Sequence, residues 1–278
     1  MEPGLYIVPT PIGNLADVSQ RSLDVLGGVS LIAAEDTRHT ARLLKHFGIG
    51  TALFAYHDHN EHEATEQLLL RLEDGASLAL VCDAGTPLVS DPGYRLVRGA
   101  QDRGIRVTPL PGPCAAVVAL SASGLPTDRF HFEGFLSAKP TARSARLRDL
   151  ANYQSTLIFY EAPHRIVATL EDAVAVLGPG REAVLGRELT KAFETIHRAP
   201  LVELLAWVKG DPDQQRGEQV LLIGPAPAAL EDQLSDREHH LLIRLGEELP
   251  PRKAAALAAE LTGHKARTLY QLLVQRQE

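Results

Sequence analysis

Four ionisable side chains stand within five positions of the sequence: Glu35, Asp36, Arg38 and His39. They follow a short apolar run that is typical of a buried strand. Acids and a histidine at a strand end could withdraw a proton from a substrate hydroxyl, and an arginine could hold an anion. The alternative is a solvated helix start in which Asp36 or Thr37 caps the helix and Arg38 pairs with an acid. The sequence leaves both interpretations open.

A second candidate site begins at Asp83, directly after another apolar run, with the residues DAGTPLVSDPG at 83–93. Open α/β sheets bind ligands at the carboxyl ends of their strands, where this acid would lie. Gly85 lets the backbone come close to a ligand, and two prolines stiffen the turn. The alternative is a strand-to-helix loop that binds nothing, with a helix N-cap at Ser90 or Asp91.

Cations gather in residues 137–148, which contain Lys139, Arg143, Arg146 and Arg148 and no acid. In an acidic protein, four cations without a counter-charge indicate either a phosphate-binding loop or a mobile surface. We favour phosphate binding.

Histidines and cysteines do not form a metal-binding pattern. His57, His59 and His62 lie among acids, but His57 and His59 would point to opposite faces of a continuing strand, and no HExxH spacing is present. Cys82 and Cys114 have no zinc spacing and make no disulfide framework, which is typical of a reducing compartment. We expect Cys114 to pack as a small side chain rather than to act as a nucleophile. No metal is predicted.

The elements that must position these groups alternate between strand-like and helical patterns, which predicts an α/β fold. Residues 88–103 are expected to form a helix, and an alanine-rich helix should open near residue 115 and end at 123. In the second half, strands follow one another more often, which indicates antiparallel parts. The expected strands are residues 5–8, 31–34, 53–56, 78–81, 106–110, 130–135, 156–160, 183–186 and 218–223.

A third region is entirely helical, and two short helices at 252–261 and 265–274 flank a Gly-containing turn. This pattern is similar to a helix-turn-helix, although a packing or dimerisation module is an equal alternative. The expected domains are an N-terminal α/β domain at 1–124, a C-terminal α/β domain at 125–226 and a helical module at 227–278.

Composition limits the functions that remain. The chain has 278 residues, 45% of them hydrophobic, so it can bury a sizeable core. No apolar run approaches the roughly 20 residues of a membrane span, and the first residues show no signal-type stretch. We therefore expect a cytoplasmic protein that does not contact a membrane. A net charge of −7 argues against broad, non-specific nucleic-acid binding but allows a local basic face.

Six motifs in this order resemble one family. They are LYIVPTPIGN at 5–14, AEDTRHT at 34–40, DAGTPLVSDPG at 83–93, PGP at 111–113, FYEAPHR at 159–165 and RELTK at 187–191. Together they are similar to the bacterial 16S ribosomal RNA cytidine-2′-O-methyltransferases of the tetrapyrrole methylase superfamily. The departures are Cys114 where serine is usual, Asp58 where glutamate is usual, Ala199 near a usual glycine, and an extra loop at 211–215.

The resemblance implies two α/β domains with S-adenosylmethionine bound in the cleft between them, and a homodimer. It implies methylation of a decoding-centre cytidine in 16S ribosomal RNA of the small subunit, and no DNA partner. The cofactor would be held by the first-domain loops, with the strand end Phe159–Glu161 covering the adenine. The cofactor residues so implied are Pro11, Asp83, Ala84, Gly85, Thr86, Pro87, Ser90, Pro113, Cys114, Ala115, Phe159, Tyr160 and Glu161.

A ribose hydroxyl is a poor nucleophile until its proton is withdrawn, so the reaction should use a positioned base. The candidates for the catalytic groups are Glu35, Asp36, His39, Glu188 and Lys191, with Glu161 as a further possible base. Lys191 would orient the hydroxyl rather than deprotonate it. RNA phosphates would be held by Arg38, Lys139, Arg143, Arg146, Arg148 and Arg165.

Two other functions remain open from the sequence. One is a methyltransferase of the same superfamily acting on a precorrin-like macrocycle, which would not need the basic segment, the helical module or the RELTK stretch. The other is a non-catalytic RNA-binding assembly factor, which would not need acids at strand ends.

Overall fold

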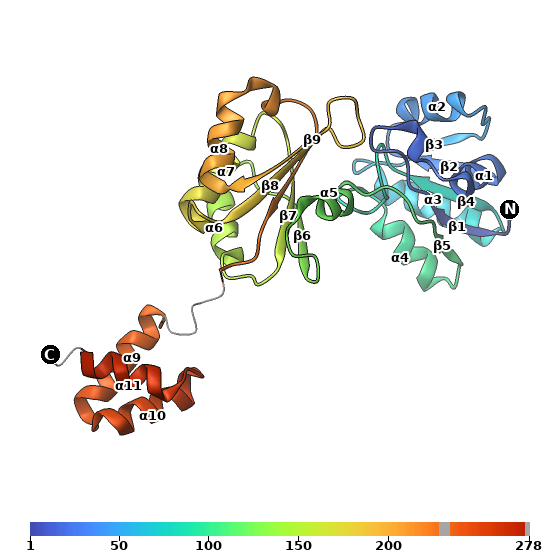
Figure 1. Cartoon of the computed structure of the whole chain (residues 1–278). Helices are drawn as coiled ribbons and strands as arrows, with labels where there is room; N and C mark the ends of the chain where they lie inside the picture. The colour runs from blue at the N-terminus through green and yellow to red at the C-terminus, as the bar shows by residue number, and fades with distance from the viewer. Residues whose placement is uncertain (228–233, 276–278) are drawn as a thin grey trace. The chain divides into compact units, whose positions relative to one another are not determined.

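The computed structural model describes residues 1–227 and 234–275 of the chain. It divides into two compact units, Met1–Pro225 and Ala226–Glu278, and each is described by itself (Figure 1). The expected helical module at 227–278 includes positions 228–233 and 276–278, which lie outside the described residues.

The first unit opens with a five-stranded sheet in which every neighbouring pair is parallel, in the order β3-β2-β4-β1-β5. Its central strands are continuous apolar runs because helices cover both faces of the sheet. The α/β prediction is therefore confirmed for this half. The strands are β1 (Gly4–Ile7), β2 (Leu31–Ala34), β3 (Leu53–Ala55), β4 (Ser77–Val81) and β5 (Val107–Pro109).

Two layers of helices enclose this sheet. Helices α1 (Gln20–Gly28) and α2 (Thr37–His46) pack with Ile32 and Ala79 on one face, and a short 3-10 helix, Leu15–Asp17, precedes them. Helices α3 (Glu61–Glu73) and α4 (Tyr94–Asp102) pack on the other face. The candidate acids follow the carboxyl ends of these strands. They therefore lie at one edge of a core that has three layers.

The expected helix start near residue 88 is wrong, because α4 begins at Tyr94. Leu88 and Ser90 have φ of 72° and 70°, which no helix accommodates, and Gly93 with φ of 133° is the N-cap residue. Neither Ser90 nor Asp91 caps the helix. The segment before α4 is instead a loop of fixed, left-handed shape.

The second sheet has the order β6-β7-β10-β8-β9, with β6 and β7 parallel and the other pairs antiparallel. The prediction of antiparallel parts is confirmed, and one strand, β9, was not predicted. Its sequence, TIHRAP, has few apolar residues because β9 is an edge strand with half-exposed side chains. The strands are β6 (Phe130–Phe135), β7 (Thr156–Glu161), β8 (Glu182–Arg187), β9 (Thr195–Pro200) and β10 (Gln219–Ile223).

The two faces of the second sheet have different partners. Helices α6 (Pro140–Leu150), α7 (Ile166–Leu177) and α8 (Leu201–Gly210) build the larger apolar core on one face, and the short 3-10 helix Pro212–Gln215 falls in the expected extra loop. Helix α5 (Ala115–Ser123) covers the other face. Although α5 precedes the expected boundary at 124, its buried side chains belong to the core of the second sheet.

The second unit contains α9 (Asp236–Glu248), α10 (Pro251–Thr262) and α11 (Ala266–Gln275). Their apolar side chains form a separate core that includes Leu242, Ala255 and Leu269. The two helices expected on either side of residues 262–264 are present as α10 and α11, and Gly263 closes α10 in the left-handed conformation.

Candidate functional site

A cavity of about 430 Å³ lies in the first unit, between the strand ends of the first sheet and the second sheet. This is the size range of sites that enclose small organic ligands. Its wall combines acids, backbone of the 83–91 loop and apolar side chains. The lining residues are Ile12, Glu35, Asp83, Ala84, Gly85, Thr86, Val89, Ser90, Asp91, Cys114, Ala115, Phe135, Tyr160, Glu161, Ala162, Pro163, Leu189, Glu218, Gln219 and Val220.

Backbone hydrogen bonds fix the loops at the floor of the cavity. Thr10 and Gly85 exchange two of them, at 2.9 and 3.0 Å, and the Thr10 hydroxyl donates to the carbonyl of Cys82 at 3.1 Å. The Thr86 hydroxyl donates to the carbonyl of Pro113 at 2.8 Å. Gly85 has φ of 87°, so a side chain there would be strained as well as crowded by Ile12. The floor is thus preorganised.

Three carboxylates, those of Glu35, Asp83 and Asp91, give the cavity a strongly negative region. Burial raises the pKa of Glu35, and the nearby charges of Asp91 and Asp83 raise it further. Burial also raises the pKa of Asp91. Like charges held together out of water favour protonation or a bound cation. The cavity is therefore suited to a ligand that carries positive charge.

Asp36 caps helix α2. Its carboxylate accepts hydrogen bonds from the backbone N–H groups of Arg38 at 2.8 Å and His39 at 3.3 Å, and these bonds lower the pKa of Asp36. The Arg38 side chain is 90% exposed and stands 3.7 Å from Asp36. The alternative interpretation of a capped helix start is confirmed. Neither Asp36 nor the exposed His39 lines the cavity, so a catalytic role for them stays a prediction.

Lys191 is held at the mouth of the cavity by two acids. Its Nζ lies 2.9 Å from Glu188 Oε1 and 3.0 Å from Glu218 Oε2. Burial works against the charge on Lys191, but these two hydrogen bonds prevail and raise its pKa. The Lys191 stem lies against Gly13, where an added Cβ would stand 2.4 Å from its Cγ. Lys191 is a fixed cation and not a proton acceptor at neutral pH.

Glu188 is committed to the same cluster. Its Oε1 also accepts the backbone N–H of Glu218 at 2.8 Å, and its side chain packs over Gly217. Burial opposes ionisation of Glu188, but the hydrogen bonds from Lys191 and the Glu218 N–H, together with the charges of Lys191 and Arg187, outweigh it and lower the pKa. A carboxylate with a lowered pKa is a weak base, so the geometry favours Glu188 as an anchor for Lys191.

An aromatic wall closes the cavity on the side of the second sheet. The Tyr160 ring contacts Phe132 and Phe135 edge to face, with ring centroids 5.0 and 5.7 Å apart. The Tyr160 hydroxyl accepts the backbone N–H of Ala116 at 3.3 Å, which ties the wall to α5. Phe159 points to the opposite face and is fully buried in the core, because side chains alternate along a strand. The expectation that Phe159 covers a ligand is corrected.

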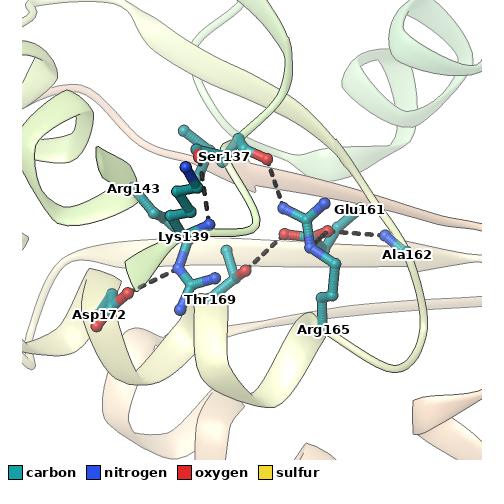
Figure 2. A network of polar contacts seen from close by, with 9 residues as sticks. Ser137, Lys139, Arg143, Glu161, Ala162, Arg165, Thr169 and Asp172 are labelled. Carbon is teal, nitrogen blue, oxygen red and sulfur yellow. Dashed lines mark hydrogen bonds and ion pairs between the residues drawn. The ribbon is translucent and has the colours of Figure 1, made fainter. Parts of the chain in front are cut away.

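Glu161 and Arg165 form a polar network behind this wall (Figure 2). The Glu161 side chain is 1% exposed, and it accepts hydrogen bonds from the Thr169 hydroxyl and the Ala162 backbone N–H. Arg165 Nε lies 3.1 Å from Glu161 Oε1, and the guanidinium also donates to the carbonyl of Leu136. Both side chains are occupied in joining the β6 and β7 strand ends. Glu161 as a base and Arg165 as an RNA contact stay predictions, and the geometry favours bracing roles for both side chains.

The basic segment also differs from its prediction. It forms helix α6, and counter-charges come from other elements: Arg143 Nε lies 2.7 Å from Asp172, and Arg146 makes two hydrogen bonds to Glu133. Arg143 is buried, and Figure 2 shows its contact with Asp172. The expectation of four uncompensated cations is wrong for Arg143 and Arg146. Exposed Lys139 and Arg148 keep their predicted contact with RNA as a prediction.

Nine of the thirteen expected cofactor residues line the cavity, and Pro11, Pro87, Pro113 and Phe159 do not. Sequence reasoning missed several others. Ile12, Asp91 and Leu189 lie inside motifs that were noted, whereas no sequence signal marks Phe135 or Val220. Within residues 1–227 and 234–275, no group of three or more potential ligands could hold a metal ion, and no helix is long and apolar enough to cross a membrane.

Comparison with known proteins identifies the family of the chain that forms this cavity. Residues 4–205 match the family model of the tetrapyrrole (corrin/porphyrin) methylases, and residues 232–277 match the RsmI C-terminal HTH domain. The ribosomal RNA small subunit methyltransferase I of Escherichia coli O157:H7 is 58% identical over 98% of this chain and 95% of that protein. The protein of the same name from Vibrio cholerae is 56% identical over 96% of this chain and 93% of its own length. The chain belongs to the tetrapyrrole methylases and, within them, to the ribosomal RNA small subunit methyltransferase I family.

Solved structures of other proteins are similar in fold to this chain. The methyltransferase CobJ has a TM-score of 0.60 at 20% identity and covers 80% of this chain and 94% of its own. A uroporphyrin-III C-methyltransferase from Thermus thermophilus complexed with S-adenyl homocysteine has a TM-score of 0.54 at 19% identity and covers 80% and 97%. The fold and family predictions are confirmed.

As a member of this family, the chain is a methyltransferase that uses S-adenosylmethionine. The cavity has the chemistry that this cofactor needs. Its carboxylates suit the positively charged sulfonium and amino groups, and its aromatic and aliphatic wall suits the adenine. No Gly-rich phosphate loop is required, because the cofactor carries no phosphate.

We expect Arg143→Ala to lower the free energy of unfolding by about 3 kcal/mol, because it leaves a carboxylate without its buried partner. Arg148→Ala, five positions along the same helix but exposed, should change it by less than about 0.5 kcal/mol. Urea denaturation of both variants followed by circular dichroism measures the difference. Equal stabilities would contradict a structural role for Arg143.

We expect Glu35→Gln to raise the melting temperature at pH 7. The raised pKa of Glu35 means that its ionised form is less favourable in the folded protein than in the unfolded chain. The gain should shrink as the pH falls through the raised pKa of Glu35, and it should be lost below the ordinary carboxyl pKa, where wild-type Glu35 is protonated in both states. Asp36→Ala should lower the melting temperature instead, since it removes a helix cap. Scanning calorimetry between pH 4 and 8 would show a destabilised Glu35→Gln variant if this account is wrong.

Proposed function

We propose that this methyltransferase transfers a methyl group to the ribose 2′-O of a decoding-centre cytidine in 16S ribosomal RNA, in the cytoplasm and as a homodimer. The observation that carries the proposal is identity above 55% to ribosomal RNA small subunit methyltransferase I proteins over nearly the whole chain. The matches cover 98% and 96% of the chain and so include the C-terminal helical domain, whereas the CobJ structure covers 80% of the chain.

The cofactor would occupy the cavity beside Glu35, Asp83 and Asp91, with the loop at 84–86 and the start of α5 around it. When bound, S-adenosylmethionine supplies a methyl group on a sulfonium, which is an excellent leaving group. The chain's own task is then to hold the ribose hydroxyl in line and to remove its proton.

Glu35 is the best-placed base among the predicted catalytic residues. It lines the cavity, whereas Asp36 and His39 do not, and its raised pKa brings it closer to neutrality than an ordinary carboxyl. Lys191 provides a fixed positive charge at the cavity mouth through its ion pairs with Glu188 and Glu218. A cation there would stabilise the hydroxyl oxygen as negative charge develops on it.

A macrocycle methyltransferase is the alternative of the same superfamily, and the C-terminal helical domain speaks against it. The helix-turn-helix match gives this chain a module of a kind that contacts nucleic acid. A binding factor without activity is disfavoured, because the acids of the cavity destabilise an empty scaffold without a catalytic reason for their presence.

The deciding experiment incubates the full chain with labelled S-adenosylmethionine and small subunits from cells that lack this modification. We expect label on a single cytidine 2′-O, located by nuclease digestion. Label on another atom or nucleotide would overturn the assignment, and transfer to a tetrapyrrole instead of RNA would establish the alternative.

Lys191→Met should lower kcat on the order of a hundredfold, as expected for loss of one charge-stabilising group, and leave the Kd of S-adenosylmethionine unchanged. The matched control is Lys209→Met, which removes an exposed lysine paired with Glu171 on the face covered by α7 and α8. If Lys191→Met and Asp36→Ala both kept wild-type kcat with normal cofactor binding, neither residue would be catalytic.

The acid limb of kcat/KM against pH reports the base. With Glu35 as the base, activity rises as Glu35 loses its proton, and the limb lies above the ordinary carboxyl pKa. Asp91→Asn removes the largest charge that raises the pKa of Glu35, so the limb should move to lower pH. Asp58→Asn removes a smaller contribution and should move it less. A limb that moves with neither substitution would exclude Glu35 as the base.

A further inference from the structure

The loop between β8 and β9 connects the cavity to the protein surface and stands out from the end of the second sheet (Figure 1). Leu189, near its start, lines the cavity. Lys191, two residues later, reaches Glu218 on the cavity wall. Phe193, two residues after Lys191 in the same loop, is therefore close along the chain to groups at the cavity mouth.

This loop is held in one shape before any ligand arrives. Glu188 and Thr190 have φ of 51° and 66°, a conformation that side chains other than glycine adopt only under constraint. The Thr190 backbone N–H donates to the Glu194 carboxylate at 2.7 Å, and the Glu194 N–H donates to the Lys191 carbonyl at 3.2 Å. Contact of Lys191 with Gly13 joins the loop to the first sheet. Such strain at a loop is typical of functional sites.

Phe193 is the most exposed large hydrophobic side chain of the described residues, at 75%. A single exposed apolar side chain is ordinary by itself. This one differs because it stands on a braced loop whose base contributes to the cavity. A rigidly presented ring loses little conformational freedom when a flat partner covers it.

We propose that Phe193 is a stacking platform for an unpaired base of the substrate RNA, and this rests on the proposed RNA function. A ribose can present its 2′-hydroxyl in a cavity only if its nucleotide leaves the regular stack. The exposed base then needs a new surface, and proteins supply aromatic side chains for this purpose. Phe193 thereby acts in substrate binding and specificity, while the cavity acids and Lys191 act on the ribose.

The test compares Phe193→Ala, Phe193→Leu and Phe193→Trp in the full chain with unmodified small subunits as substrate. We expect Phe193→Ala to lower kcat/KM by about tenfold to a hundredfold, in line with the loss of one base stack. Phe193→Leu keeps apolar bulk without a π face and should not restore it, whereas Phe193→Trp should. The Kd of S-adenosylmethionine, measured by calorimetry, should be unchanged in all three.

Phe130→Ala is the matched control. Phe130 is a half-exposed phenylalanine at the opposite end of β6 from the cavity-lining Phe135, so its removal should leave kcat/KM unchanged. Wild-type activity of Phe193→Leu or of Phe193→Ala would overturn the proposal. A changed oligomeric state of Phe193→Ala in sedimentation would also overturn it, because the ring would then serve contact with a second copy. If the wild-type chain methylates no RNA at all, the proposed function fails before the Phe193 variants are compared.

Discussion

One cluster of buried apolar side chains fixes the position of the two sheets of the first unit relative to each other. Ile12 comes from the loop after β1, and it packs with Ala116 and Ala119 of α5, with Leu189, and with Val184 and Val220 of the second sheet. Because α5 follows the first sheet in sequence but is buried on the second, the chain cannot separate the two sheets without exposing this cluster. The cavity walls keep their spacing through burial of these side chains and not through polar contacts across the opening.

The charged side chains of the cavity, unlike the apolar cluster, do not stabilise the fold. The cavity concentrates Glu35, Asp83 and Asp91, whose repulsion opposes stability. The arginines nearby do not relieve it, because Arg143 and Arg165 are paired within the second sheet's own helices and loops. The described residues thus form a negative cavity with the braced Lys191 at its mouth. This is an arrangement that attracts a cationic donor and still offers positive charge to the acceptor.

The sequence predicted the strands of the first sheet well, because each is a continuous apolar run ended by a polar loop. It predicted the left-handed loop before α4 poorly, since positive φ at Leu88 and Ser90 leaves no mark in residue type. Strand β9 escaped because an exposed edge strand has no apolar pattern. The motifs located the cavity but not all of its far wall, where Phe135 and Val220 are ordinary hydrophobic residues.

In the same way, the sequence could not predict which charged side chains would pair in space. Residues 137–148 contain no acid, so the partners Glu133 and Asp172 could be found only once the elements were packed together. Strand alternation would have separated Tyr160, whose ring faces the cavity, from Phe159 and Glu161, whose side chains point towards the helices. The resemblance to the family implied one shared role for Phe159, Tyr160 and Glu161, and it did not indicate this difference.

The strand order also determines when the site comes into existence during synthesis. In the first sheet β1 lies between β4 and β5, so the first strand of the chain waits for residues 77–81 and 107–109 before it has neighbours. Ile12 finds part of its packing only in β10, at residues 219–223. Contacts of such long sequence separation form slowly. A nascent chain therefore carries its methyltransferase cavity unfinished until about four-fifths of its length has been translated, and a truncated product would have the motifs without the site.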